Sequence, residues 1–211
     1  MTIFLLITAG YFLGSIPFGL ILTRAFGAGD LRQIGSGSIG ATNVLRTGRK
    51  GLAAATVLLD GAKGAVAVLL VRHFAPELGD AGAMLAGAAA MIGHCYPVWL
   101  RFRGGKGVAT LLGLYLALAW PIAAVFAVVW LAMVAVSRIS SLGGMAGVVA
   151  APIAALALGY PVYAIGLAGL AVIVLWRHRE NIARLRAGTE PRIGGKKDAP
   201  KKAGPKEAGG A

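Results

Sequence analysis

The sequence predicts an all-α integral membrane protein, and three observations indicate this fold class. The chain has 211 residues, of which 57% are hydrophobic, and its mean hydropathy is +0.75, whereas soluble domains are about 45–50% apolar even when glycine is counted. The apolar residues gather in long runs, which is typical of membrane-spanning helices. The basic residues gather between particular runs, as they do in the cytoplasmic loops of membrane proteins.

Five apolar runs reach the length of roughly 20 residues that a spanning helix requires. They cover residues 2–23, 52–71, 81–100, 108–137 and 142–176. No cation precedes the first run, so we expect a helix that enters the membrane from outside and not a signal peptide.

The last two runs are long enough for one tilted helix or for two short helices each. Thirty helical residues reach about 45 Å, whereas the hydrocarbon core is about 30 Å thick. Pro121 and the segment "GYP" at 159–161 lie near the midpoints of the two runs. Seven helices would place Arg138 inside, which the positive-inside rule favours, and five would place it outside. We therefore predict seven transmembrane helices, with five as the alternative.

The charge distribution predicts how the chain is oriented. Cations concentrate in residues 24–50, in residues 101–106 and after residue 176, whereas residues 72–80 hold a single arginine. The rule then places the N-terminus on the periplasmic side and the C-terminus in the cytoplasm. A net charge of +13 could indicate a nucleic-acid partner, but the apolar runs favour a membrane partner instead.

Two parts of the chain differ in composition. Residues 1–194 contain all the apolar runs and are expected to form the membrane domain. Residues 195–211 are rich in Gly, Ala, Pro and Lys and show no periodic apolar face, so we expect a disordered basic tail.

Three polar segments, at 35–51, 93–110 and 177–194, fall on the predicted cytoplasmic side. Glycine-rich loops let N–H groups approach an anion, hydroxyl groups add donors, and Arg or Lys adds charge. The first segment is therefore a candidate phosphate-binding loop, with a flexible linker as the alternative. Its candidate ligands are Ser36, Ser38, Thr42, Asn43 and Arg46.

The other segments offer further candidates. Gly104, Gly105 and Lys106 precede an expected helix, whose N-terminus favours anions. His178 and Asn181 stand at i and i+3, on one face of a helix that leaves the membrane. A fourth segment, residues 137–141 with Ser141 at its end, lies on this side only if there are seven helices. Convergence on one membrane face predicts a single site.

The spacing of residues excludes several chemistries. A P-loop requires lysine where Ala41 stands and a hydroxyl residue where Gly107 stands, so nucleotide hydrolysis is not expected. The sequence has no paired carboxylates at catalytic spacing, no metal-ligand spacing and no G-x-S-x-G elbow. We therefore expect neither a metal nor a cofactor.

Two features within the apolar runs are open to more than one interpretation. Asp60 and Lys63 lie one turn apart, and a mutual ion pair and a functional role are equally compatible with that spacing. His94 near the end of its run favours a structural role.

Taken together, five motifs resemble those of the bacterial acyl-phosphate-dependent glycerol-3-phosphate acyltransferases, integral membrane enzymes of phospholipid synthesis. The motifs are "GSIPFG" at 14–19, "GSGSIGATNVLRTG" at 35–48, "LLDGAKG" at 58–64, "GHCYPVWLRFRGGKGVAT" at 93–110 and "RHRENIARLRAGTE" at 177–190. The resemblance covers nearly the whole chain up to about residue 194. Ser38 departs from it, because the family often has Asn at that position.

The resemblance implies seven helices in the bacterial inner membrane, with the motifs on the cytoplasmic face. It implies transfer of a fatty acyl group from acyl phosphate to the sn-1 hydroxyl of glycerol 3-phosphate, without a cofactor. Ser36, Arg46 and Lys106 would then hold phosphate groups, with Ser38, Gly104, Gly105 and Ser141 beside them. Thr42 and Asn43 would orient the loop or the glycerol, and His178 and Asn181 would bind substrate near the attacking hydroxyl.

Two questions stay open at this point. The group that takes the hydroxyl proton is either His178 or a substrate phosphate. The alternative function is a membrane transporter for a phosphorylated anion, because basic loops and broken helices also suit a transporter. A transporter would favour repeated halves, and the sequence shows no clear internal repeat.

Overall fold

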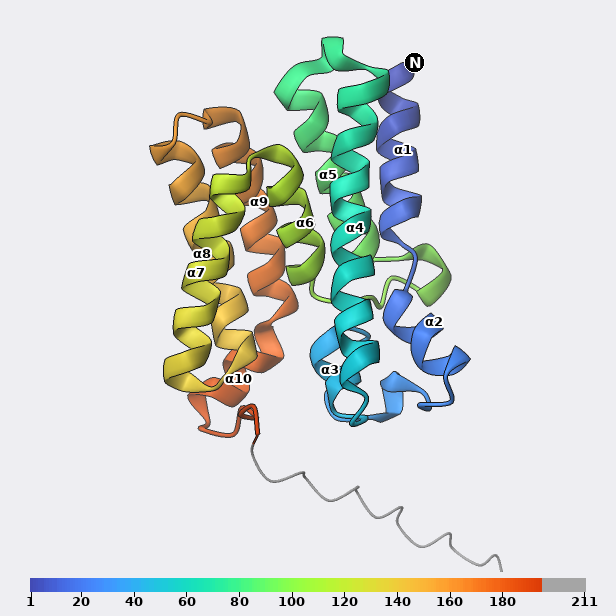
Figure 1. The fold of residues 1–211 in the computed structure, drawn as a ribbon, viewed down its shortest axis with the longest axis vertical. Helices are drawn as coiled ribbons and strands as arrows, with labels where there is room; N and C mark the ends of the chain where they lie inside the picture. Colours follow the sequence, from blue (N-terminus) through green and yellow to red (C-terminus); the bar gives the residue numbers. More distant parts are fainter. Residues whose placement is uncertain (195–211) are drawn as a thin grey trace, which may run out of the picture.

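A computed structural model describes residues 1–194 of the chain, and Figure 1 shows their arrangement. The α-helices are α1 (Thr2–Gly14), α2 (Phe18–Ala25), α3 (Ala41–Leu45), α4 (Lys50–Phe74), α5 (Gly79–Cys95), α6 (Val108–Leu118), α7 (Trp120–Ser137), α8 (Ser140–Ala157), α9 (Pro161–Arg177) and α10 (Arg179–Arg186). Short 3-10 helices cover Leu31–Gln33, Pro76–Leu78 and Val98–Leu100. The described residues form no strand, which confirms the all-α class. The predicted tail at 195–211 lies outside the described residues.

Several helices are long and apolar enough to cross a membrane. Five candidate spans cover Thr2–Ala25, Lys50–Phe74, Pro76–Leu100, Trp120–Ser137 and Ser140–Ala157. A sixth is formed if α9 and α10 count as one span bent by 59°. Helix α6 has 11 residues and is about 17 Å long, less than the hydrocarbon core. The count of seven crossings and the orientation of the termini therefore stay predictions.

Both long apolar runs divide into two helices, as the seven-helix prediction requires. The second divides at the expected "GYP" segment, where Gly159 has a φ of +82° that favours glycine. The first divides at Ala119, two residues before the expected Pro121, because Pro121 occupies the first turn of α7. Proline is well tolerated there, since the N–H groups of a first turn have no partner within the helix.

The first apolar run also breaks, between α1 and α2, at residues 15–17. The break frees backbone carbonyls, and the Lys63 ammonium of α4 donates to the carbonyl of Ile16 over 3.0 Å. Lys63 also lies 2.8 Å from a carboxylate oxygen of Asp60, and both side chains are buried. The two residues form the mutual ion pair that was one of the two interpretations. His94, near the end of α5, lies 3.7 Å from the same oxygen.

Small residues let neighbouring helices approach closely. A Cβ atom at Gly113 of α6 would lie 1.9 Å from the carbonyl oxygen of Gly61 in α4. One at Gly64 would lie 2.2 Å from the carbonyl oxygen of Thr110. Close backbone contact of this kind is a common way for membrane helices to associate. The α4–α6 pair thus holds the centre of the bundle, where Tyr115 is fully buried.

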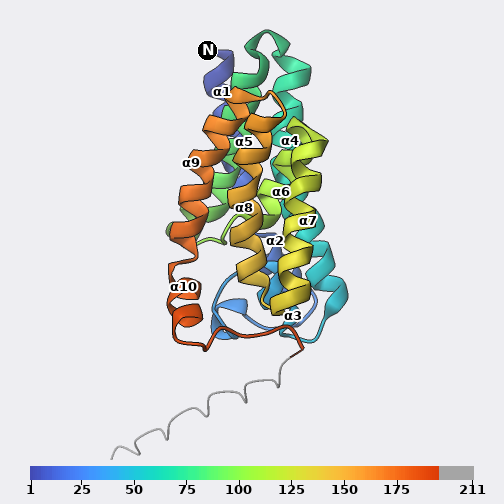
Figure 2. The same ribbon diagram turned by 90° about the vertical axis from the view of Figure 1, so that its left-hand side faces the viewer.

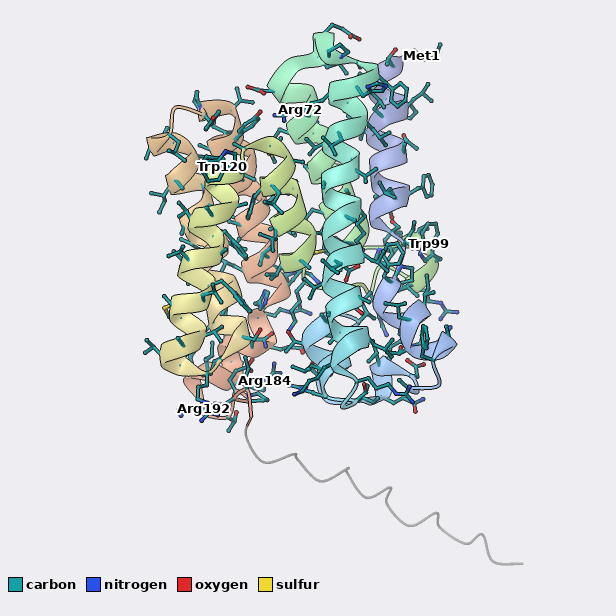
Figure 3. The ribbon with its side chains drawn as sticks, viewed as in Figure 1. Met1, Arg72, Trp99, Trp120, Arg184 and Arg192 are labelled. Carbon is teal, nitrogen blue, oxygen red and sulfur yellow. The ribbon has the colours of Figure 1, made fainter. Side chains whose placement is uncertain are left out.

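The bundle has two distinct ends. Figures 1 and 2 show the start of α1 and the α4–α5 and α8–α9 connections at one end, and α2, α3, α10 and the α7–α8 junction at the other. In Figure 3, Met1 and Arg72 lie toward the first end, and Arg184 and Arg192 lie at the second. The α5–α6 connection lies at an intermediate level, because α5 and α6 are short (Figure 1). The predicted polar segments thus gather toward one end.

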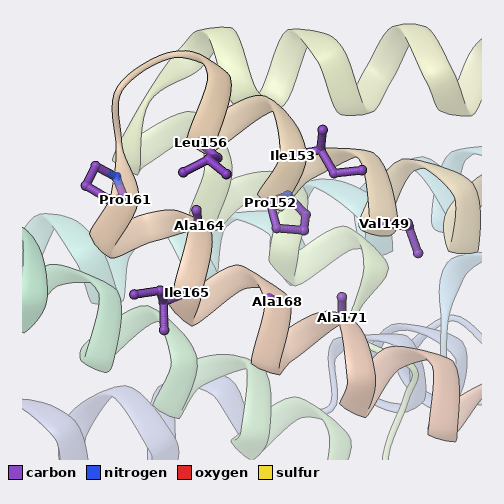
Figure 4. Close-up of a pocket in the computed structure, with 9 residues that line it drawn as sticks. All are labelled: Val149, Pro152, Ile153, Leu156, Pro161, Ala164, Ile165, Ala168 and Ala171. Atoms are coloured by element: carbon purple, nitrogen blue, oxygen red, sulfur yellow. The ribbon is translucent and has the colours of Figure 1, made fainter.

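The outward faces are apolar. An open groove of about 540 Å³ runs between α8 and α9, and apolar side chains line it (Figure 4). Its lining includes Val149 and Ala171 at one end and Leu156 and Pro161 at the other. This surface suits contact with lipid chains and not with water.

Candidate active site

The candidate site lies at the polar end of the bundle, where the α5–α6 loop meets α10 and the start of α8. The Lys106 ammonium donates to the side-chain oxygen of Asn181. The Asn181 amide nitrogen donates to Glu190 over 2.5 Å. An ammonium only donates and a carboxylate only accepts, so the two neighbours fix the orientation of the amide. The structure thus joins two of the predicted site residues directly.

Glu190 is the centre of this network. Its carboxylate accepts from Ser141 over 2.5 Å, from Asn181 over 2.5 Å and from Arg184 over 2.7 Å. Burial raises the pKa of Glu190, but the hydrogen bonds from these three donors outweigh it, so the pKa lies below its usual value. Glu190 therefore holds the start of α8, α10 and the segment after α10 together as an anion.

Sequence reasoning missed Glu190 and Arg184. Glu190 follows α10 after the turn at Gly188. The residues next to it in the sequence therefore give no sign of the side chains that it contacts. The available signal was its position as the last residue of the motif at 177–190.

Lys106 is a partly buried cation. Burial lowers its pKa to about 8, and the positive charges of Arg184 and Arg46 act in the same direction, while Glu190 opposes them. Arg46, on the first loop, is the smallest of these influences on the pKa of Lys106. The site thus gathers several positive charges that a doubly charged phosphate would compensate.

The two glycines before Lys106 are packed closely against α5. A Cβ atom at Gly105 would lie 2.1 Å from the Nε2 atom of His94, and one at Gly104 would lie 2.1 Å from the His94 carbonyl oxygen. Their N–H groups donate to the carbonyls of His94 and Cys95, over 3.0 and 3.1 Å. These contacts give the glycines a role in shaping the loop, and their contact with a phosphate stays a prediction.

Arg177 holds the same loop from the other side. Its guanidinium donates to the carbonyl oxygens of Gly104 and Gly105, over 2.8 and 3.1 Å. It also lies over the ring of Tyr96 at 5.2 Å. The loop that carries Lys106 is therefore fixed between α5 and the end of α9.

Asn43 organises the first loop. It is buried, and its amide nitrogen lies within hydrogen-bond distance of the carbonyl oxygens of Leu31, Ile34 and Ser38. Its side-chain oxygen accepts from the Ser36 N–H over 3.4 Å. Of the two roles expected for Asn43, these contacts favour orienting the loop.

The other candidates of the first loop reach outward. Arg46 is exposed, and its Nη1 atom lies 3.5 Å from the side-chain oxygen of Asn43. Thr42 lies 3.4 Å from the hydroxyl of Ser140, which connects this loop with α8. The hydrogen bonds of Ser36 and Ser38 stay within their own loop. The first loop therefore meets the rest of the site through Thr42 and the charge of Arg46.

His178 is the N-cap of α10 and Asn181 is its third residue, so the two keep the expected i, i+3 placement on one helix. That helix is not a straight continuation of the span, because α9 ends at Arg177 and α10 turns away by 59°. Helix α10 is highly charged, so it lies at the end of the bundle and does not continue along the apolar axis. His178 sits at the bend, where its Nδ1 atom lies 2.8 Å from the carbonyl oxygen of Val174.

The side chains of this site are suited to binding an anion. Among residues 1–194, no group of three His, Cys, Asp or Glu side chains is placed to hold a metal ion. The site instead offers an ammonium, guanidinium groups, hydroxyl groups and a buried imidazole. Such a set of groups can bind phosphates and stabilise negative charge.

Comparison with known proteins places these features in a family. The family model described as glycerol-3-phosphate acyltransferase matches residues 4–188. A glycerol-3-phosphate acyltransferase of Ruegeria sp. (strain TM1040) is 62% identical over 187 residues, which cover 89% of this chain and 91% of the relative. One of Novosphingobium aromaticivorans is 66% identical over 191 residues, which cover 90% and 95% of the two chains.

A solved structure agrees with these matches. The crystal structure of PlsY (YgiH), an integral membrane glycerol 3-phosphate acyltransferase in its glycerol 3-phosphate form, superposes with a TM-score of 0.87 at 35% identity. The match covers 92% of this chain and 96% of that one. The lysophosphatidic acid form of PlsY gives a TM-score of 0.85 at 34% identity. The chain therefore belongs to the glycerol-3-phosphate acyltransferase family of integral membrane enzymes.

Proposed function

We propose that the protein transfers a fatty acyl group from acyl phosphate to the sn-1 hydroxyl of glycerol 3-phosphate. The products are 1-acyl-sn-glycerol 3-phosphate and inorganic phosphate, and the reaction takes place at the cytoplasmic face of the bacterial inner membrane. The contact of Lys106 with Asn181, which joins the α5–α6 loop to α10, is the observation that carries this proposal. The glycerol 3-phosphate and lysophosphatidic acid forms of PlsY support the acceptor and the product.

Positive charge suits both substrates, because each carries a phosphate. In our proposal Ser36, Arg46 and Lys106 hold the phosphate groups, with Ser38, Gly104, Gly105 and Ser141 around them. Thr42 connects the first loop to α8, and Asn43 keeps that loop in shape. Asn181 binds substrate beside Lys106.

The protein needs to supply little chemical activation, because acyl phosphate is a mixed anhydride and is already activated. The acceptor hydroxyl oxygen bonds to the acyl carbon, the bond from that carbon to the phosphate oxygen breaks, and phosphate leaves with the electron pair. Positioning of two bound phosphates and stabilisation of developing charge then supply much of the rate.

His178 is one candidate for the group that takes the hydroxyl proton. The Val174 carbonyl can only accept, so the hydrogen bond at Nδ1 requires the proton on that nitrogen. The Nε2 atom then carries the lone pair and is able to accept a proton. A substrate phosphate is the other candidate.

One assay tests the donor. Purified protein is incubated with palmitoyl phosphate and glycerol 3-phosphate, and inorganic phosphate and lysophosphatidic acid are measured. We expect both products in equal amounts, and none with palmitoyl-CoA in place of palmitoyl phosphate. The sn-1 position is read by chromatography of the product against authentic 1-acyl and 2-acyl standards. Turnover with palmitoyl-CoA, or a 2-acyl product, would contradict the proposal.

Two variants link the assay to the site. Lys106→Ala removes a charge-assisted contact, which is worth about 10- to 100-fold in kcat/KM. Lys50→Ala is the matched control, because Lys50 is an exposed lysine at the start of α4. Unchanged apparent affinity of the Lys106→Ala protein for both phosphates would remove Lys106 from the phosphate-binding set.

The transporter alternative makes a different prediction in the same preparation. It requires counterflow of glycerol 3-phosphate in liposomes without acyl transfer. Membership in an acyltransferase family favours the enzyme.

A further inference from the structure

A second basic site lies outside the candidate active site. A recess of about 410 Å³ is lined by Arg32, Trp99, Leu100, Arg101 and Arg103. None of these residues contributes to the network around Asn181 and Glu190. In Figure 3, Trp99 lies across the molecule from Arg184, beside α1 and α2.

The backbone beneath this recess is in an unusual conformation. Arg101 and Phe102 both have positive φ angles, of 51° and 60°, which residues with a Cβ atom rarely adopt. Hydrogen bonds hold the turn, from the Phe102 N–H to Pro97 over 3.0 Å and from the Arg103 N–H to Leu100 over 3.1 Å. Two such residues in succession are costly, and conformations of this kind cluster at binding sites. Here the turn directs Arg101 and Arg103 to one recess.

The recess carries uncompensated positive charge. Asp30 accepts a hydrogen bond from the guanidinium of Arg32 over 2.5 Å, so it neutralises that arginine. Within residues 1–194, neither Arg101 nor Arg103 forms an ion pair. A guanidinium is weakly hydrated and presents a planar fork that matches the oxygens of a phosphate. The chemistry of the recess thus fits a phosphate group.

The side chains around the recess indicate what kind of phosphate compound it suits. Trp99 is half exposed, stacks on Phe12 of α1 with ring centroids 5.9 Å apart, and donates to the Ser15 carbonyl over 2.7 Å. Phe12 and Phe102 are also exposed, and α1 belongs to a candidate span. Tryptophan is enriched where a membrane protein crosses the level of the lipid headgroups. Trp99 and Leu100 end the candidate span Pro76–Leu100, so Arg101 and Arg103 stand directly after an apolar segment, where a lipid phosphate is a suitable partner.

We propose that this recess binds the phosphate headgroup of an anionic membrane phospholipid, as a site separate from the one at Lys106. Arg101 and Arg103 bind the phosphate, and Trp99 packs against the adjoining chain region of the lipid. Arg103 directly precedes Gly104, whose carbonyl oxygen accepts from Arg177 over 2.8 Å. One loop therefore carries the headgroup site and, three residues later, Lys106.

Native mass spectrometry of the full-length protein in detergent tests the proposal. The protein is titrated with phosphatidylglycerol and with phosphatidylcholine of the same acyl chains. Each arginine at the membrane surface is worth about fivefold in affinity for an anionic lipid. We expect the first phosphatidylglycerol to bind about 10-fold or more tightly than phosphatidylcholine.

Double variants show which residues produce the preference for phosphatidylglycerol. Arg101→Gln with Arg103→Gln should reduce it to about twofold or less. Arg49→Gln with Lys50→Gln removes the same charge from the start of α4 and should leave it unchanged. Arg101→Lys with Arg103→Lys keeps the charge and should retain most of it. Thermal unfolding in detergent reports whether each variant is folded.

Three outcomes would overturn the proposal. The first is an equal preference for phosphatidylglycerol in the wild type and the double Gln variant. The second is displacement of the lipid by millimolar inorganic phosphate, which would identify a site for free phosphate. Loss of the preference in the Arg49 and Lys50 control would indicate a general charge effect and would count against the recess as well. Because neither lipid binding nor the folding control depends on acyl transfer, failure of the proposed reaction would leave the lipid measurement intact.

Discussion

Lys106 and Arg46 are both cations of the candidate site, but their surroundings differ. Arg46 is exposed on the first loop. Lys106 is partly buried, and burial with the charge of Arg184 lowers its pKa to about 8. The protein therefore holds Lys106 close to the pH at which it loses its charge, whereas a guanidinium stays charged.

This pKa predicts how substrate affinity depends on pH. As pH rises through about 8, Lys106 loses its proton and the KM for glycerol 3-phosphate should increase. The phosphate itself is fully ionised above pH ~7, so it does not contribute to the change. Bound phosphate favours the charged lysine, so the increase continues to higher pH than the pKa of the free enzyme.

Lys106→Arg is the control, because arginine stays protonated over this range. Its KM should be nearly constant between pH ~7 and ~9.5, whatever its absolute value. Equal pH dependence in the two proteins would show that Lys106 is not the titrating group.

A substitution of His178 tests whether this residue is the base. If its Nε2 atom takes the hydroxyl proton, His178→Ala should lower kcat about 100- to 10,000-fold. Thermal unfolding in detergent shows whether the variant is folded. Near-normal turnover in a folded variant would remove His178 as the base and leave the substrate phosphate.

Between helices, contacts of two kinds stabilise the bundle. One is the buried pair of Asp60 and Lys63, whose lysine also donates to the Ile16 carbonyl at the break between α1 and α2. The other is the close approach of α4 and α6 at Gly61 and Gly113. Both contacts lie deep in the bundle, so each should be sensitive to a single substitution.

Breaking the buried pair should destabilise the protein strongly. Lys63→Met leaves the buried Asp60 carboxylate without its lysine and with only the His94 imidazole at 3.7 Å, which costs about 3–5 kcal/mol in the free energy of unfolding. Asp60→Leu with Lys63→Met removes both charges and should cost less. The exposed pair of Asp30 and Arg32 is the control, and Asp30→Asn should change stability by at most about 1 kcal/mol. Denaturant unfolding in micelles measures all three, and equal losses would contradict the role of the buried pair.

The contact of α4 and α6 gives a prediction for glycine. Gly113→Ala places a Cβ atom 1.9 Å from the Gly61 carbonyl oxygen, so the helices must separate, at about 1–3 kcal/mol. Gly169 of α9 has no atom within 4 Å of such a Cβ. Gly169→Ala should therefore be neutral, or stabilising by up to about 1 kcal/mol, because alanine is the better helix former. Similar unfolding midpoints for the two variants would show that the packing at Gly113 tolerates a side chain.

For the whole molecule, the position of each end relative to the membrane is testable with single cysteines. In a Cys95→Ala background, Glu77→Cys lies in the α4–α5 connection and Ser140→Cys lies at the start of α8. With seven spans and the N-terminus outside, an impermeant reagent should label position 77 in intact cells and position 140 only after permeabilisation. Labelling of both positions in intact cells would indicate five spans.

Much of this architecture follows from the sequence, because apolar length and turn residues act locally. The runs, the division at "GYP" and the Asp60–Lys63 pair depend on residues close together in the chain. The division at Ala119 was expected near Pro121, because proline is found both within a break and at the start of the helix that follows one.

The site was only partly predictable. Its polar segments could be recognised, but Lys106 and Asn181 are 75 positions apart. Their contact depends on the packing of several helices, which no local pattern specifies. Glu190 looked like an isolated acid until Ser141, Asn181 and Arg184 were seen to converge on it. The bend at His178 could not be predicted, because the i, i+3 spacing of His178 and Asn181 is the same whether α10 continues α9 or turns away from it.

The network at Glu190 determines when the polar end of the bundle can be completed during synthesis of the chain. Glu190 joins Ser141 and Asn181, and the Ile193 N–H donates to the Arg138 carbonyl over 2.7 Å. These contacts cannot form until the ribosome has synthesised nearly all of the described chain. The apolar helices can therefore enter the membrane while the polar end is still incomplete, and the candidate site stays unfinished until α10 and the segment after it have folded back onto the bundle.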